Sequence, residues 1–285
     1  MGTTMHNRTN NLRWLAATLL AALPGMALAG QFPLWEAGAG LALINFPDYR
    51  GSDERNNYAL PVPYVVYRGE VLQVDRQKVR GLFFKSDSAE LDFSLNGSVP
   101  VKSDSNRARK GMPNLDPTLE AGPSLNFFLH RSQDQRFNLD LRLPLRAVYA
   151  IDLPHARHTG WLFHPQLNLD LLNVGPGRGW NLGFAAGPLF ADQRYHRYFY
   201  TVEPAYATAE RPAYAARGGY AGTQLVAAVS KRFPNFWFGA FVKADTLRGA
   251  AFADSPLVKT KQSMVGGFAI SWIFSQSGTI VEARE

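Results

Sequence analysis

The feature that most constrains this chain is an alternation of apolar and polar side chains, sustained over segments of about ten to fourteen residues. In segment 136–149, apolar residues stand at odd positions, with Asn138, Asp140 and Arg142 between them. A period of two places successive side chains on opposite faces of a β-strand. Soluble strands usually have about 5–6 residues, whereas a membrane-spanning strand needs about 9–11, apolar toward lipid and polar toward the lumen. The alternation therefore predicts an all-β chain, a transmembrane antiparallel up-and-down β-barrel.

About twelve strands are expected, and their connections alternate in length. The expected strands are residues 34–46, 57–67, 70–75, 78–85, 88–98, 118–130, 135–150, 160–173, 178–191, 218–232, 235–248 and 262–275. Short turns alternate with longer loops at residues 47–56, 99–117, 151–159, 192–217 and 249–261. Short periplasmic turns and long external loops are typical of barrels in the Gram-negative outer membrane. An even number of strands places both termini on the periplasmic side.

The N-terminal residues have the three-part order of a secretory signal peptide. A polar stretch with two arginines precedes the apolar core 14–23, and Ala-Leu-Ala at 27–29 forms a cleavage site between small residues. We therefore expect residues 1–29 to be a cleaved signal peptide. Residues 30–275 are expected to form the outer-membrane barrel, and residues 276–285 a short polar periplasmic tail.

Composition and charge exclude several classes of protein. The 285 residues include no cysteine, which excludes disulfide frameworks, thiolate metal sites and cysteine nucleophiles. The formal net charge of +7 comes from basic residues scattered among acidic ones, so we expect no nucleic-acid partner. We also expect no cofactor.

The polar faces of the expected strands carry charges in mid-strand, and a barrel turns this face toward its lumen. The candidate lumen charges are Glu90, Asp92, Glu120, Asp140, Arg142, Arg146, Asp170, Lys243 and Asp245. These charges indicate either a water-filled pore whose selectivity they set, or ion pairs that fill a narrow barrel. Because twelve strands lie between small filled barrels and open porins of about 16–18 strands, we favour a narrow lumen.

Histidines are the residues to weigh for catalysis and metal binding. His155 and His158 share one expected loop at a spacing that suits a metal ion, but no third ligand accompanies them. His164 lies among polar neighbours on an inward face, and the chain has no Gly-x-Ser-x-Gly motif. We therefore expect no catalytic residue, no metal site and no enzymatic activity. An outer-membrane hydrolase is the least favoured hypothesis, which a tight Ser-His or Asp-His pair at the rim would revive.

Basic and aromatic residues gather in the long loops. Segment 194–200 holds four aromatic residues, and such a stretch seldom stays fully solvated, so we expect it to fold over or into the barrel mouth. These loops suit lipopolysaccharide phosphates or another anionic ligand, although ordinary solvated charge explains them equally well. The candidate contacts with a ligand or partner are Tyr49, Arg50, Asp53, Arg197, Tyr198 and Tyr206.

Four motifs occur in order along the chain: PDYRGSD at 47–53, PYVVYRG at 63–69, EAGPSLN at 120–126 and EPAYATAERPAY at 203–214. With these motifs the sequence resembles the MipA/OmpV family of outer-membrane proteins. The resemblance implies scaffolding for murein synthesis, in which the namesake brings a lytic transglycosylase together with a bifunctional murein synthase. Other members are linked to osmoregulation, adhesion or antibiotic uptake.

Two hypotheses of function follow. The first is a non-enzymatic scaffold, surrounded by outer-membrane lipids and lipopolysaccharide, with its partner contacts on the periplasmic turns and tail. The second is a narrow channel or ligand-binding pore for small solutes, antibiotics or osmotic adaptation, with the charged lumen and long loops as working parts. Deletion of residues 192–217 should change conductance or uptake by a pore and leave a periplasmic scaffold intact.

Overall fold

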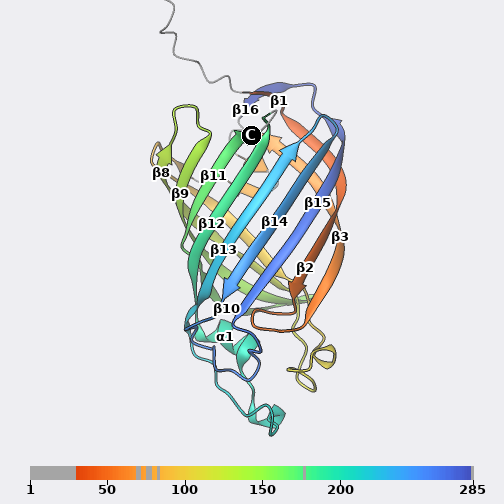
Figure 1. The fold of residues 1–285 in the computed structure, drawn as a ribbon, viewed down its shortest axis with the longest axis vertical. Coiled ribbons are helices and arrows are strands. Elements are labelled where there is room, and N and C mark those ends of the chain that lie inside the picture. The colour runs from red at the N-terminus through yellow and green to blue at the C-terminus, as the bar shows by residue number, and fades with distance from the viewer. Residues whose placement is uncertain (1–29, 69–71, 75–78, 82–83, 176–177, 284–285) are drawn as a thin grey trace, which may run out of the picture.

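The computed structural model describes residues 30–68, 72–74, 79–81, 84–175 and 178–283. The expected signal peptide lies outside these residues, as do parts of the expected strands 70–75 and 78–85. Within the described residues the chain forms one large antiparallel barrel, which confirms the predicted fold class (Figure 1). No helix in this part of the chain has the length and hydropathy to cross a membrane.

The strands of the barrel follow the expected segments to within about two residues, except for the expected strands 70–75, 78–85 and 160–173. They are β2 (Trp35–Pro47), β3 (Arg55–Arg68), β4 (Leu72–Val74), β5 (Val79–Gly81), β6 (Phe84–Lys85), β7 (Ala89–Ser98), β8 (Thr118–Arg131), β9 (Phe137–Asp152), β10 (His155–Phe163), β11 (Gln166–Val174), β12 (Trp180–Ala191), β13 (Gly219–Arg232), β14 (Phe236–Thr246) and β15 (Gln262–Gln276). Most strands pair with their neighbours in sequence, while β10 and β11 both pair with β9 and β12 rather than with each other. β15 pairs with β2, which brings the last strand of the barrel beside the first. At the two ends of this strand order, β5 lies against β7, which completes the barrel.

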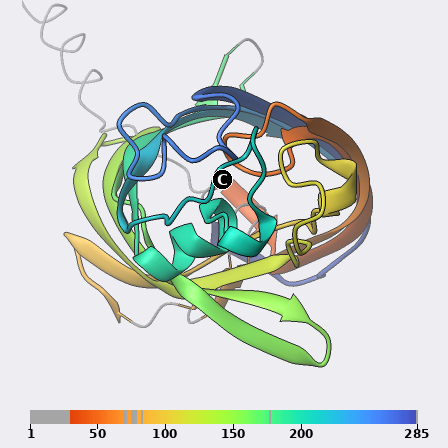
Figure 2. The ribbon, with the colours of Figure 1, turned by 90° about the horizontal axis from the view of Figure 1, so that it is seen from below.

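Two features of this topology differ from the expectation. The expected strand 160–173 is divided into β10 and β11, because Pro165 has no N–H for the ladder and His164 faces Pro144, which also has none. The expected loop 151–159 is wrong, since β9 and β10 continue as a hairpin to the turn Leu153-Pro154. This hairpin projects beyond the barrel rim (Figure 2).

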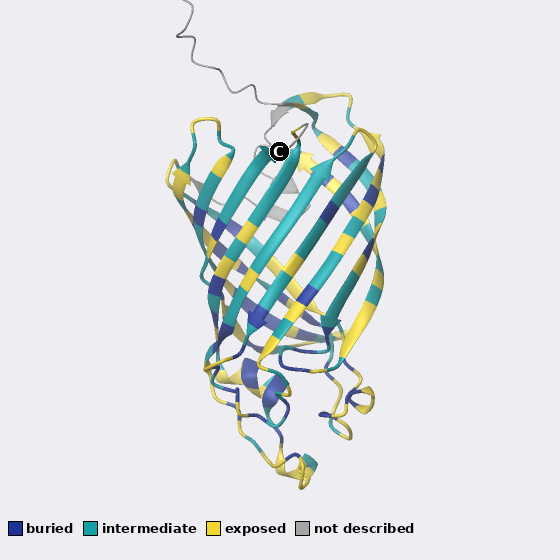
Figure 3. Ribbon diagram, viewed as in Figure 1, coloured by how far each residue is buried: buried dark blue, intermediate teal, exposed yellow. Residues whose placement is uncertain are grey.

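Apolar and polar side chains lie on opposite faces of the strands, as the alternation predicts. Large apolar side chains are exposed on the outside, where they can meet lipid. They include Leu41, Leu43, Val65, Leu95, Leu119, Leu145, Leu167, Leu225, Phe268 and Ile270. Figure 3 shows exposed and half-buried positions along the barrel wall, and buried residues gathered near α1.

The two ends of the barrel differ in structure. One end, here called the loop end, carries the long loops, with the 3₁₀ turns Ser103–Ser105 and Pro204–Tyr206 and the helix α1 (Gln193–Tyr200). The opposite end, called the turn end, carries short turns and a two-stranded ribbon in which β1 (Gly30–Pro33) pairs with β16 (Ile280–Ala283). The ribbon joins residues near both ends of the described chain, and it includes part of the expected polar tail.

Candidate functional site

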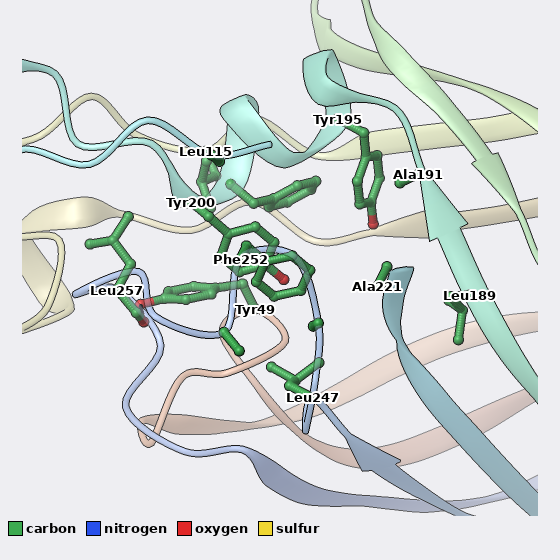
Figure 4. Packing of buried hydrophobic residues seen from close by; sticks show 14 of the residues in the cluster. Tyr49, Leu115, Leu189, Ala191, Tyr195, Tyr200, Ala221, Leu247, Phe252 and Leu257 are labelled. Carbon is green, nitrogen blue, oxygen red and sulfur yellow. Dashed lines mark hydrogen bonds between the residues drawn. The ribbon is translucent and has the colours of Figure 1, made fainter. Parts of the chain in front are cut away.

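The long loops and α1 fold over the loop end of the barrel (Figure 2). They contribute to a buried apolar cluster, called the cap. Its largest members are Tyr49, Leu115, Tyr195, Phe199, Tyr200, Leu247, Phe252 and Leu257. Tyr200 and Phe252 stack face to face with their ring centroids 3.6 Å apart (Figure 4). The aromatic stretch 194–200 therefore folds over the mouth, as the sequence predicted.

Local sequence explains why α1 forms there. The Asp192 side chain caps the helix by accepting the Tyr195 N–H at 2.8 Å. The helix packs against β10 at Gly160, whose φ is +134°. A Cβ at Gly160 would lie 2.3 Å from Asp192 Oδ1, so only glycine permits this close approach.

Hydrogen bonds tie the cap to the barrel wall. Arg50 makes a two-pronged ion pair with the inward carboxylate of Asp245, at 2.6 and 2.8 Å. The Tyr200 hydroxyl donates to the Arg50 carbonyl at 3.0 Å, and the Tyr49 hydroxyl donates to the Leu257 carbonyl at 2.8 Å. These bonds hold the first loop, α1 and the loop 247–261 as one unit.

A second set of contacts, called the clasp, joins the first two long loops. Asn106 donates to Asp48 at 2.7 Å and to Ser52 at 3.2 Å. Arg107 forms ion pairs with Asp53 and Glu54, at 3.0 and 2.7 Å. Because the Arg107 side chain is 78% exposed, this pair adds little stability, whereas the buried Asn106 fixes the loop positions.

Burial in the cap shifts the pKa of its titratable groups. Burial raises the pKa of Tyr49, and it raises the pKa of Tyr198 to about 12. Burial also lowers the pKa of His196, whose Nδ1 lies 2.5 Å from the Arg217 carbonyl. These groups are neutral near pH 7, so the cap is held by packing and neutral hydrogen bonds around the Arg50–Asp245 pair.

Most candidate lumen charges lie on the inner wall in ion pairs. Glu120 pairs with Arg146 at 3.3 Å, and Arg142 reaches Asp140 at 3.4 Å and Asp170 at 3.2 Å. Arg131 also pairs with Asp140. Glu90 and Asp92 are buried on the inner face of β7, and Lys243 is half-buried on β14.

An inward carboxylate that the sequence analysis missed lies near the turn end. Glu36 is fully buried and accepts from Tyr64 at 2.9 Å and from Arg232 at 3.0 Å, with Arg68 at 3.5 Å. The sequence signal that could have identified Glu36 is its position in strand β2, where even-numbered residues face inward. Phe252 and Leu257 of the cap were also missed, because they are isolated apolar residues in a loop.

The candidate contact residues do not form one site. Tyr49 and Arg50 belong to the cap, and Asp53 belongs to the clasp. Tyr198 packs against the cap and donates to the Asp116 carbonyl. Arg197 is exposed beside Glu203, and Tyr206 accepts from Arg211 through its carbonyl. Arg197 and Tyr198 line a polar cleft of about 960 Å³ between α1 and β10.

The histidines also lie apart. The His158 ring contacts the rings of Tyr149 and Trp161 and lies 3.0 Å from Arg194. His155 is exposed in the hairpin, and His164 is buried in the wall. Within the described residues, no group of three metal-binding side chains comes together.

The family model described as MltA-interacting protein MipA matches residues 39–274. No curated protein matches the chain. An outer membrane channel from Pseudomonas putida F1 is 12% identical, with a TM-score of 0.45 over 89% of this chain and all of that one. A bacterial polysaccharide outer membrane secretin is 10% identical, with a TM-score of 0.38 over 84% of this chain and 99% of that one. The Ralstonia pickettii toluene transporter TbuX is 10% identical, with a TM-score of 0.25 over 89% of this chain and 72% of that one.

Proposed function

The chain belongs to the MipA family of MltA-interacting proteins, and from this premise we propose that it is a non-enzymatic outer-membrane scaffold for murein enzymes. Its partners would be a lytic transglycosylase and a bifunctional murein synthase. The loop end would face outward and the turn end, with both termini, the periplasm.

The observation that carries the proposal is the cap across the loop end. An open porin needs a continuous aqueous path, whereas here the cap buries Tyr200, Phe252 and Leu257 across the mouth. The ion pairs of Arg142 and Arg146 further occupy the lumen. Both features favour a structural role over free diffusion of ions.

The partner surface would be the turn end. A stable interface usually buries about 1,200–2,000 Å², which is more than short turns offer. The β1–β16 ribbon extends this surface, and the side chain of Ile280 in it is 52% exposed. We therefore place the partner contacts on the ribbon and the adjacent turns.

Two measurements on the refolded barrel test the scaffold. In a planar bilayer we expect no steady single-channel current, because the cap and the ion pairs close the path. In a pull-down, immobilised barrel should retain both a purified lytic transglycosylase and a purified bifunctional murein synthase. Failure to bind either enzyme would overturn the scaffold.

A narrow channel or uptake pore is the second candidate. It is favoured by the inner wall of β7 near the loop end, where Asn96 and Ser98 are exposed although they follow the buried Glu90 and Asp92 on the same face. Steady ion-selective current from the intact chain would favour this candidate.

A further inference from the structure

The polar cleft between α1 and β10 has a basic lining that the scaffold does not use. Its volume is about 960 Å³, and its arginines are Arg157 on β10 and Arg194 and Arg197 on α1. All three side chains are exposed. The lining also includes the carboxylates of Asp192 and Glu203. Whether the cleft can bind an anion therefore depends on how far these carboxylates neutralise the arginines.

Helix α1 has one apolar side and one basic side. Tyr195, Phe199 and Tyr200 are buried in the cap. Arg194 and Arg197 are exposed and three residues apart, a spacing that makes two side chains neighbours on a helix. The helix lies beside the β9–β10 hairpin (Figure 2). Packing of the apolar side on the cap thus holds two guanidinium groups in the cleft.

The carboxylates of the lining compete only weakly for these two arginines. Asp192 is engaged as the N-cap of α1, where it accepts the Tyr195 N–H at 2.8 Å. Glu203 lies 3.6 Å from Arg197, and both side chains are more than half exposed, so this pair contributes little. Arg194 donates to His158 Nδ1 at 3.0 Å, and no carboxylate of the described residues lies within 4.0 Å of it. The positive charge of Arg194 is therefore uncompensated.

Arg157 brings a third guanidinium to the cleft from the strand side. Its nearest carboxylate, Asp116, is 3.7 Å away, which is longer than a hydrogen bond. The guanidinium carbon lies 5.5 Å from the centre of the Tyr198 ring. A guanidinium has five N–H donors, so these two contacts leave donors of Arg157 available to a ligand.

The cleft adjoins an aromatic belt on the outside of the barrel. The His158 ring contacts the rings of Tyr149 and Trp161. Tyr149, Trp161 and Phe190 are large exposed side chains near the loop ends of β9, β10 and β12. Such belts mark the interface between lipid chains and headgroups. With the loop end outward, the headgroups at this height are the phosphorylated sugars of lipopolysaccharide.

We propose that the cleft between α1 and β10 binds the phosphate groups of lipopolysaccharide. Arg194 and Arg197 donate from the helix and Arg157 from the strand, because paired guanidinium N–H groups match two phosphate oxygens. Pockets of about 300–1,000 Å³ hold ligands of drug size, so the sugar that carries the phosphate also enters. The proposal rests on the outward orientation of the loop end proposed above, and it is independent of the murein enzymes at the turn end.

Calorimetric titration of the refolded barrel in phosphatidylcholine nanodiscs tests the ligand. The probes are deacylated lipopolysaccharide, which keeps its phosphates and dissolves in water, the same saccharide after dephosphorylation, and inorganic phosphate. EDTA prevents divalent cations from bridging a phosphate to a carboxylate. We expect the phosphorylated saccharide to bind about tenfold more tightly than either other probe, since one lacks the charge for the guanidinium groups and the other lacks the sugar. Equal affinity for the dephosphorylated saccharide or for inorganic phosphate would overturn the proposal.

Substitutions locate the binding in the cleft. Arg194→Gln with Arg197→Gln should weaken binding about 25-fold, at about fivefold for each charge. Arg107→Gln with Arg248→Gln is the matched control, because it removes the same charge from exposed arginines of other loops, one ion-paired and one not. Glu203→Gln should tighten binding, since it removes the competitor for Arg197. Folding of each variant is verified by heat-modifiable gel mobility. Equal losses in the two double variants, or weaker binding after Glu203→Gln, would show that the phosphate does not bind here.

Labelling of intact cells separates this proposal from the orientation on which it rests. The chain has no cysteine, and Leu153 at the tip of the β9–β10 hairpin is 86% exposed. A membrane-impermeant maleimide should therefore label Leu153→Cys from outside the cell. Labelling only after lysis would place the loop end in the periplasm and overturn both the orientation and the proposal. Labelling of intact cells together with failed titrations would overturn the cleft alone and leave the pull-down test of the scaffold unaffected.

Discussion

At the scale of single residues, the ion pair between Arg50 and Asp245 connects the cap with the barrel wall. Asp245 is 4% exposed and Arg50 is 18% exposed, so each charge depends on the other for solvation. Such a pair contributes little net stability over an apolar substitute, but removal of one partner leaves a buried charge.

We predict that Arg50→Ala destabilises the folded barrel by about 3–5 kcal/mol, because the buried carboxylate of Asp245 then loses both hydrogen bonds from Arg50 and retains a long one from Gln224 at 3.4 Å. Arg107→Ala is the control, and its exposed pairs should contribute about 0–1 kcal/mol. Urea unfolding in lipid vesicles measures both. Equal effects of the two substitutions would show that Arg50 does not anchor the cap.

From the environment of His196 we predict that the stability of the cap depends on pH. The His196 side chain is fully buried, Nδ1 lies against a carbonyl, and the ring is 4.6 Å from Phe252. Burial lowers the pKa in the folded cap, with Arg50 acting in the same direction. The unfolded loop takes up a proton near pH 6.5 and the folded cap only at lower pH, so stability is complete above about 6.5 and falls below it.

Unfolding of the cap is followed by the near-ultraviolet circular dichroism of its stacked aromatic rings. The urea midpoint of this signal should fall between about pH 7.5 and 5. His196→Gln keeps an N–H donor for the Arg217 carbonyl but does not titrate in this range, so it should lose part of the fall. If the variant shows the full pH dependence, other groups are responsible.

At the scale of elements, strands were predictable and the cap was predictable only in part. Period-two alternation located β2, β3, β8 and β13 to within about two residues, because membrane depth demands long regular strands. The start of β10 at His155 was missed, because the hairpin that projects beyond the barrel rim has no regular apolar alternation. The partners of α1 were missed because isolated residues such as Phe252 carry no periodic signal.

The cap should respond in a graded way to changes in its elements. Asp192→Ala removes the N-cap of α1 and should cost about 1 kcal/mol. Phe252→Ala removes a fully buried ring stacked on Tyr200 and should cost about 3–5 kcal/mol. Proteolysis of the loop 192–218 under native conditions reads out both. The reverse order would mean that the helix, not the stack, holds the cap.

At the scale of the whole molecule, the two ends are joined by a stiff ladder and are therefore expected to act independently. Strands of 12–14 residues such as β12 and β13, tilted as in other barrels, separate the ends by about 30 Å. This exceeds the Debye length of about 8–10 Å in physiological salt. A change confined to the cap should not reach the turn end through electrostatics.

Deletion of residues 193–217, with a short glycine linker in their place, separates the two proposed roles. It removes α1 and much of the cap but spares the β1–β16 ribbon. We predict that the silent barrel becomes conducting, because the buried rings no longer close the mouth, while affinity for the murein enzymes stays unchanged. Planar-bilayer recording and the pull-down measure the two properties on one preparation. If the deletion abolishes enzyme binding in a correctly folded barrel, the partners dock at the loop end and the proposed orientation is wrong.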